Sequence, residues 1–298
     1  MPNAKIIIRA EYLSYNRIKK MYYIGDIEIN EYEWNVSKFS GHQYTAEQLL
    51  FNTRRTTKNG TMTRDDIDFE MHHKSTSIIQ VSGLTQESFD YFINSYGEQF
   101  KSIYFFGCKE IKDLSVLSQL HKLEYILFYW IRQADVLWDM SRNDNLRGLQ
   151  INDASKIMRN LGMIASAPKL EEIRLGGSIE TNQKIQALDI FSECEKLKRL
   201  SLLGLTLTKN DVEPLTRISN LEILDFEPNF LETEQIAYLV AKLPDVTGMS
   251  MCAYNDYSFT SNIKVCGKRK PSLSIPKQQD LLNKYIEEFN NLVCEYKS

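Results

Sequence analysis

Residues 122–130 read KLEYILFYW, and the fold can be worked out from this segment and its relatives in the chain. Its length and its β-branched and aromatic residues are typical of a β-strand, yet it is apolar on both alternating faces. One face of a strand normally joins the core. The other face carries Tyr125, Leu127 and Tyr129, which raises the question of what these side chains contact.

The same stretch is one copy of an internal repeat. Its frame, L-x-x-L-x-L, recurs at steps of 23, 24, 27 and 24 residues, with the leading leucines at Leu123, Leu146, Leu170, Leu197 and Leu221. Weaker copies flank these five, at Thr76–Val81, Phe100–Phe105 and Val246–Met251. The pattern predicts about eight units that stack, because one unit cannot bury enough apolar surface alone.

This run of frames resembles the leucine-rich repeat family, whose period is about 20–29 residues. The resemblance covers roughly Thr76–Tyr254. The family often places Asn three residues after the last Leu of the frame, where its amide ties neighbouring turns together. Only Asn229 fits among the corresponding positions here, which are Leu84, Cys108, Ile131, Ala154, Ser178, Leu205, Asn229 and Tyr254. The repeats are therefore irregular, and the asparagine ladder is largely absent.

Four segments between the frames show apolar residues at helical spacing: 85–97, 154–165, 184–194 and 233–243. Thr85 is a suitable helix N-cap, and Gly97 a suitable stop. The predicted fold class is an α/β leucine-rich repeat solenoid. Its curved parallel sheet lines the concave side, and its helices lie on the convex side, because strands are spaced more closely than helices.

Three domains are expected: an N-terminal α+β cap or small subdomain at 1–75, the repeats at 76–260, and a last strand with a capping helix at 261–298. Stacked repeats expose apolar ends and need caps.

The N-terminal part contains strand-like runs at Lys5–Ile8 and Met21–Ile29 and a helical segment, TAEQLLFNTR, from Thr45. Asn262–Cys266 has the pattern of a last strand. An amphipathic helix begins at Gln279 and is expected to seal the last repeat; the alternative is a partner-binding helix.

Composition narrows the class of protein. The chain has 298 residues, is 43% hydrophobic and 25% charged, and carries a net charge of -3, which argues against a dedicated nucleic-acid binder. Its five cysteines include no CxxC pair, which favours reduced thiols over a disulfide framework. No run approaches the roughly 20 apolar residues of a membrane span, and the N-terminus lacks a secretory apolar region. We expect a soluble, cytoplasmic protein.

Motifs for chemistry are weak. The four histidines do not have metal-ligand spacing, and the acidic run Asp65–Glu70 lacks the calcium-loop pattern, so a charged strand or loop face is expected there. The basic run Gly267–Pro271 is expected to be an exposed loop. No phosphate-binding or nucleophile-elbow motif occurs. The sequence therefore predicts no catalytic residue, no metal and no cofactor.

The second face of the strands is the expected binding surface. Side chains at equivalent frame positions lie about 4.8 Å apart on neighbouring strands, so they form columns. The columns begin aromatic and become charged; the expected partner-binding residues are Tyr104, Phe106, Tyr125, Leu127, Tyr129, Trp130, Gln150, Arg174, Arg199 and Asp225. Tyr and Trp are typical anchors of protein interfaces. The alternative is that the N-terminal part or the loops near Phe100 cover the aromatic residues.

The predicted function is non-enzymatic recognition of a partner protein on the concave face, with an inhibitor or immunity-type protein as its narrower form. Neither a membrane nor a nucleic acid is expected as partner. The alternative is an enzyme or effector whose activity lies in residues 1–75 and whose repeats select the target. A third hypothesis, nucleic-acid contact through Lys268–Lys270, predicts affinity that collapses with salt.

Overall fold

The computed structural model describes most of the chain: residues 61–72, 77–177, 183–256 and 262–298, with the backbone of β1 (Tyr22–Ile24) and β2 (Ile27–Ile29). Strands β1 and β2 pair antiparallel, so part of the run Met21–Ile29 forms a hairpin. Lys5–Ile8 and the helical segment from Thr45 lie outside the described residues. The chain divides into two compact units, the first ending at Leu149 and the second beginning at Gln150 and taking in Asp135–Leu137.

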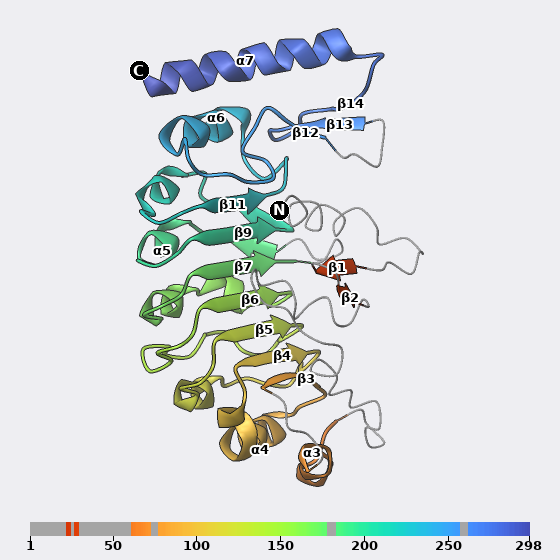
Figure 1. The fold of residues 1–298 in the computed structure, drawn as a ribbon, viewed down its shortest axis with the longest axis vertical. Helices are drawn as coiled ribbons and strands as arrows, with labels where there is room; N and C mark the ends of the chain where they lie inside the picture. Colours follow the sequence, from red (N-terminus) through yellow and green to blue (C-terminus); the bar gives the residue numbers. More distant parts are fainter. Residues whose placement is uncertain (1–21, 25–26, 30–60, 73–76, 178–182, 257–261) are drawn as a thin grey trace. The chain divides into compact units, whose positions relative to one another are not determined.

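The main sheet has seven strands, hydrogen-bonded in the order β11-β9-β7-β6-β5-β4-β3. Each strand is one of the leucine frames: β3 (Ile78–Ser82), β4 (Ser102–Phe106), β5 (Tyr125–Tyr129), β6 (Gly148–Asn152), β7 (Glu172–Gly176), β9 (Arg199–Leu203) and β11 (Ile223–Phe226). Figure 1 labels them along the chain. The repeat read from the sequence is therefore confirmed as the strand repeat of the fold.

Within each unit the strands pair parallel, and equivalent positions of the leucine frame lie opposite each other. In the first unit, Gln80 pairs with Tyr104, and Tyr104 pairs with Leu127. In the second unit, Arg174 pairs with Ser201, and Ser201 pairs with Asp225. A smaller parallel ladder joins β8 (Gln183–Ile185) to β10 (Leu205–Leu207).

One face of the strands in the first unit packs on the return segments. Phe105 stacks on Phe128 at 5.4 Å between ring centroids, and Phe89 of α4 (Gln86–Tyr96) meets Phe105 edge-on at 5.4 Å. Phe128 in turn contacts Trp138 at 6.0 Å. Successive side chains of a strand point to opposite faces, so these rings all lie on the face that packs on the helical returns. There they form the core of the first unit.

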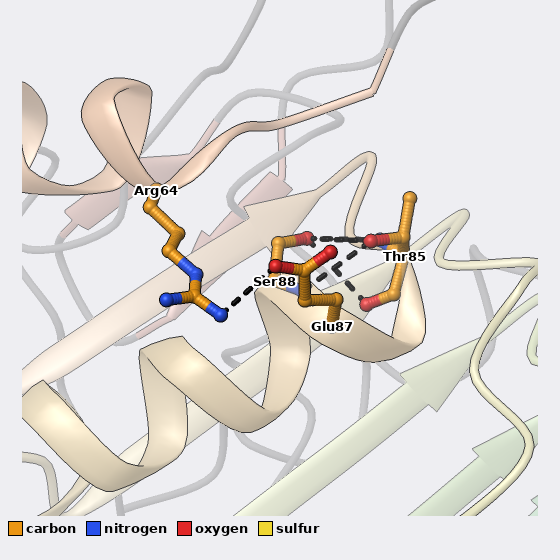
Figure 2. A network of polar contacts seen from close by, with 4 residues as sticks. All are labelled: Arg64, Thr85, Glu87 and Ser88. Atoms are coloured by element: carbon orange, nitrogen blue, oxygen red, sulfur yellow. Dashed lines mark hydrogen bonds and ion pairs between the residues drawn. The ribbon is translucent and has the colours of Figure 1, made fainter.

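The helix over residues 85–97 is confirmed, and its start has the predicted cap. Thr85 and Ser88 form a capping box, in which the Ser88 amide donates to Thr85 Oγ1 and the Thr85 amide donates to Ser88 Oγ (Figure 2). Glu87 accepts from Arg64 at 2.9 Å in the same network. Gly97 does not adopt a left-handed conformation; a Cβ there would lie 2.7 Å from the side chain of Leu120, so this glycine serves close packing.

Arg64 begins α3 (Arg64–Met71), and the prediction of a charged strand or loop over Asp65–Glu70 is wrong. Thr63 caps this helix, and Asp65 and Asp66 sit in its first turn, where carboxylates favour the positive end of the helix dipole. Asp68 accepts hydrogen bonds of 2.6 Å from the hydroxyls of Tyr91 and Tyr96. These bonds lower the pKa of Asp68 and raise the pKa of Tyr96 to about 12.

Two of the other three predicted returns differ from regular helices. The segment 154–165 contains two 3-10 turns instead of an α-helix, and 184–194 contains the end of β8 and the four-residue α5 (Asp189–Ser192). Gly162 lowers the helix propensity of the segment 154–165, which favours short turns in that segment. The 3-10 segments are η2 (Gly97–Gln99), η3 (Ser115–Gln119), η4 (Ile157–Arg159), η5 (Gly162–Ser166) and η6 (Glu213–Arg217). The third return, α6 (Thr233–Lys242), matches its prediction at 233–243.

The second unit ends differently from its repeats. The copy predicted at Val246–Met251 is a turn joined to β11 by one bridge, Ile223 to Thr247. It is followed by an antiparallel meander of β12 (Tyr254–Asp256), β13 (Asn262–Val265) and β14 (Ser272–Ser274).

The C-terminal helix is confirmed as α7 (Gln279–Lys297). Its Leu282 joins a cluster with Val265 and Leu273, and its Tyr296 meets Tyr238 of α6 edge-on at 5.5 Å. The helix covers apolar residues of the meander, as a capping element would.

Candidate functional site

The candidate surface in the first unit is the face of β3, β4 and β5 opposite the core rings. We call it the tyrosine face and define it by Tyr104, Phe106, Tyr125, Leu127 and Tyr129. Its residues come from alternate positions of β4 and β5, and the parallel register brings them side by side. They form one cluster together with Ile78 of β3.

The exposure expected for this cluster is wrong at three positions. Tyr104 is 1% exposed, Leu127 1% and Tyr125 7%. The physical reason lies partly in the neighbouring rings, which cover one another both along a strand and across adjacent strands. Tyr104 and Phe106 of β4 lie 5.9 Å apart, and Phe106 lies 5.5 Å from Tyr129 of β5. These three side chains form a second buried layer, while Phe106 and Tyr129 at the carboxyl ends of the strands are only half-buried.

The half-buried rings make up what we call the aromatic corner: Phe106, Tyr129 and Trp130. Phe106 stacks on Tyr129 at 5.5 Å with 13° between the ring planes, and Trp130 lies 5.5 Å from Phe106 and 4.8 Å from Tyr129. The ammonium of exposed Lys109 lies over Trp130, 5.6 Å from its ring centroid. The corner therefore combines three rings with one cation. No sequence motif marks Lys109.

Trp130 occupies a left-handed backbone position. A residue with positive φ follows five of the strands, and these residues are Gly83 (73°), Gly107 (68°), Trp130 (62°), Asp153 (54°) and Gly204 (63°). Glycine adopts this conformation freely, whereas a bulky residue is strained there by about 1–2 kcal/mol. Strained residues of this kind cluster at binding sites. The signal was present in the sequence, because Trp130 stands where four other repeats have Gly, namely Gly83, Gly107, Gly177 and Gly204.

Buried polar atoms line the same face of the first unit. Within the described residues, the hydroxyls of Tyr104 and Ser102 and Oε1 of Gln80 have no hydrogen-bond partner. Burial also raises the pKa of Tyr104 well above its ordinary value. An unsatisfied buried polar group costs about 1–3 kcal/mol, so these atoms lower the stability of the first unit. In the second unit, the buried Gln150 Oε1 also has no hydrogen-bond partner among the residues described.

The charged columns of the second unit form an ionic face, which we define by Glu172, Arg174, Arg199 and Asp225. Arg174 Nε donates to Glu172 Oε1 at 2.7 Å, and both side chains are largely buried. Asp225 accepts from the Met249 amide at 2.8 Å. Burial raises the pKa of the Asp225 carboxyl, against that hydrogen bond and the nearby charge of Arg174.

Arg199 is more exposed than its neighbours on the ionic face. Its guanidinium lies 4.0 Å from Glu222. Its Nε has no hydrogen-bond partner in the part of the chain that is described. The structure thus brings together Arg174 and Asp225 and leaves Arg199 on the edge of that group.

The weaker motifs have local roles. Lys268 bonds to Asn210 at 2.9 Å and lies 3.7 Å from Glu232, and Lys270 lies over the ring of Tyr285 at 5.1 Å, so both cations are partly engaged. The described ranges contain no group of three or more His, Cys, Asp or Glu residues that could hold a metal. In those ranges no helix has the length and apolar character needed to cross a membrane. Residues 1–75, where an enzymatic activity was the alternative, are mostly undescribed.

No family model matches this sequence, and no curated protein matches it. Among solved structures, an internalin (inlF) of Listeria monocytogenes is 18% identical with a TM-score of 0.44, over 58% of this chain and 47% of its own. Internalin C2 of the same organism is 16% identical, with a TM-score of 0.40 over 63% and 74%. A leucine-rich repeat protein of Leptospira interrogans is 15% identical, with a TM-score of 0.36 over 60% and 50%.

The chain thus matches about half the length of the first and third of these proteins. The strands themselves define the fold. Seven frame-matched strands share one sheet, the registers within each unit are parallel, and a helical or turn segment returns the chain between most of them. On these grounds, this chain has an α/β leucine-rich repeat fold.

Proposed function

We propose that this chain is a protein-recognition module that binds a partner protein at the aromatic corner of its first unit. The observation that carries the proposal is the half-buried stack of Phe106, Tyr129 and Trp130, with Lys109 over the indole. Trp and Tyr dominate the binding energy of protein interfaces when they are anchored in partly desolvated clusters. The proposal assigns no catalytic step to the chain.

The partner's side of the interface follows from the same chemistry. Three rings offer flat apolar area and the electron-rich faces that attract cations, and Lys109 adds one positive charge at the edge. A protein loop that presents an apolar side chain beside a carboxylate complements this corner. Tyr104, Tyr125 and Leu127 lie beneath as a packed layer, which we propose holds the outer rings in place.

The ionic face, with Gln150 alongside, is proposed as a second contact area in the other unit. A partner that reached it would meet carboxylates and guanidiniums already paired with each other, which favours specificity over affinity. An inhibitor or immunity-type role is the narrower form of the proposal. It requires that the partner be an enzyme whose active site the chain occludes.

The test is the substitution Trp130→Gly in the full chain. Glycine accepts the left-handed backbone, so the fold should be retained while the indole is lost. Proteins that co-purify with the parent chain are identified by mass spectrometry, and the Kd of the purified partner is measured by calorimetry. We expect Trp130→Gly to weaken binding by about 30-fold or more, which corresponds to about 2 kcal/mol at a hot spot.

The matched control is Phe69→Ala on α3, which removes another aromatic ring from the surface, 59% exposed. It should leave the Kd unchanged, and both variants should keep the circular dichroism spectrum of the parent. An unchanged Kd for folded Trp130→Gly would show that the aromatic corner is not the site.

A further inference from the structure

Two of the five cysteines come together where the meander leaves the last repeat. Cys252 lies in the turn before β12, and Cys266 directly follows β13. The antiparallel pairing of Tyr254 with Val265 brings the two cysteines toward each other across the strands. The Cys266 amide donates to the carbonyl of Ala253 at 2.9 Å, which extends the pairing beyond the strand ends.

The neighbouring Cys252 thiol is the largest cause that raises the pKa of the Cys266 thiol. The Cys252 Sγ donates to the Tyr254 carbonyl at 3.0 Å. Cys252 is half-buried, whereas Cys266 is buried. The other cysteines have no such neighbour among the described residues: Cys108 and Cys194 are buried against backbone carbonyls, and Cys294 is exposed on α7.

We propose that Cys252 and Cys266 form a dithiol site that a hydroperoxide oxidises reversibly to a disulfide. The Cys252 thiolate attacks one peroxide oxygen and becomes a sulfenic acid, and the leaving hydroxide takes up a proton as water. Cys266 sulfur then attacks the sulfenic sulfur, and the displaced hydroxide takes the Cys266 proton as a second water. With hydrogen peroxide, two thiols are oxidised by two electrons in total, and the peroxide is reduced to two water molecules.

The order of the two steps follows from the surroundings of each thiol. Cys252 is the accessible partner, so it meets the oxidant first. The hydrogen bond to Cys252 and then burial raise the pKa of Cys266, which keeps it protonated until its neighbour is oxidised. A resolving cysteine next to an accessible one is the usual arrangement of reversible redox sites.

The disulfide would constrain the turn that supports the ionic face. The same turn supplies the Met249 amide, which donates to Asp225 at 2.8 Å, and the Ser250 hydroxyl, which donates to the Phe226 carbonyl at 2.7 Å. Joining Cys252 to Cys266 would tie this turn to the end of β13. The oxidation state of the dithiol site is thereby linked to the support of Asp225.

The test uses the full chain carrying Cys294→Ser, which removes the exposed thiol and with it disulfides between molecules. The reduced protein is treated with hydrogen peroxide, its remaining thiols are blocked with N-ethylmaleimide, and a protease digest is mapped without reductant. We expect one cross-linked pair of peptides containing Cys252 and Cys266, with a mass loss of two hydrogen atoms. Alkylation of both cysteines should be lost and should return after treatment with dithiothreitol.

A second variant, Cys266→Ser, removes the resolving thiol. In this variant the Cys252 sulfenic acid should persist and be trapped by dimedone, more than in the parent. The proposal is overturned if the parent gains two oxygen atoms at Cys252 while Cys266 stays open to alkylation, or if neither cysteine reacts. The peptide map needs no partner protein, so its result is separate from the test of the aromatic corner.

Discussion

At the scale of single residues, Asn143 holds two turns of the first unit together. It is fully buried, its Nδ2 donates to the carbonyls of Leu117 (2.9 Å) and Leu120 (3.0 Å), and its Oδ1 accepts from Trp138 Nε1 at 2.7 Å. One amide thus satisfies three buried groups. It ties neighbouring turns together, as the asparagines of a ladder would, but from a different place in the repeat.

The substitution Asn143→Leu keeps the number of side-chain heavy atoms and removes the amide. It leaves the Trp138 indole without its acceptor, and the carbonyls of Leu117 and Leu120 each keep one bond, from the amides of Leu120 and Leu123. We expect the free energy of unfolding to fall by about 3 kcal/mol, because a buried unsatisfied donor costs about 1–3 kcal/mol and each further lost hydrogen bond about 1 kcal/mol. Urea denaturation followed by Trp fluorescence measures it, with Trp138 close to the change.

Asn145→Leu serves as the control two residues away. Asn145 is exposed and donates one bond, to the His121 carbonyl at 2.8 Å, so its loss should cost about 1 kcal/mol or less. Equal losses in the two variants would contradict the role given to Asn143. Asn220 makes the equivalent bond in the second unit, to the Glu195 carbonyl at 2.7 Å. Both residues directly precede the leading leucine of their frames, a signal that was present in the sequence.

At the scale of elements, strands were predictable and their returns were not. The L-x-x-L-x-L frame places every strand of the main sheet because its spacing reflects which side chains must enter the core. The returns 154–165 and 184–194 have apolar residues at helical spacing, but the spacing for one turn of α-helix or 3-10 helix is nearly the same. The choice depends on how much chain must fit between two strands, which the apolar pattern does not encode.

The capping role of α7 is tested with two adjacent leucines. Leu282 is 3% exposed in the cluster with Val265 and Leu273, whereas Leu281 is 39% exposed. We expect Leu282→Ala to lower stability by about 2–4 kcal/mol and to lower the melting temperature, because it opens a cavity under the helix.

Leu281→Ala changes the same chemistry on the solvent side and should stay within about 0.5 kcal/mol of the parent. Calorimetric melts of both variants decide the point. Equal melting temperatures would mean that the helix does not stabilise the meander.

At the scale of the whole molecule, repeats of this kind are joined chiefly through neighbouring strands. Stability is then close to a sum over units and the interfaces between neighbours, so damage should remain local. Leu200 of β9 is fully buried, and Leu200→Ala is expected to cost about 2–5 kcal/mol. Hydrogen exchange followed by mass spectrometry should show faster exchange in β7, β9 and β11 and little change in β3 and β4. Faster exchange in every strand would show one cooperative unit instead.

The candidate site was predictable in position but not in exposure. The frame identifies Tyr104, Tyr125 and Leu127 as neighbours on one face, because register follows from the spacing. Alternation in a strand says which side chains share a face, and says nothing about what covers that face. When both faces are apolar, as in KLEYILFYW, burial depends on packing between strands, and that is a property of the assembled repeats.

The left-handed residues at the strand ends have a consequence for how this surface can diversify. A Cβ at Gly107 would meet no atom within 4 Å, whereas a Cβ at Gly204 would lie 2.5 Å from the Gly177 carbonyl oxygen. A new side chain at Gly107 would therefore cost only the strain of its positive φ. A new side chain at Gly204 would also have to displace the main chain at Gly177. Trp130 shows that the first kind of exchange is tolerated. Substitutions at these strand-end positions could therefore change the binding surface of such a protein while the leucines of its core stay the same.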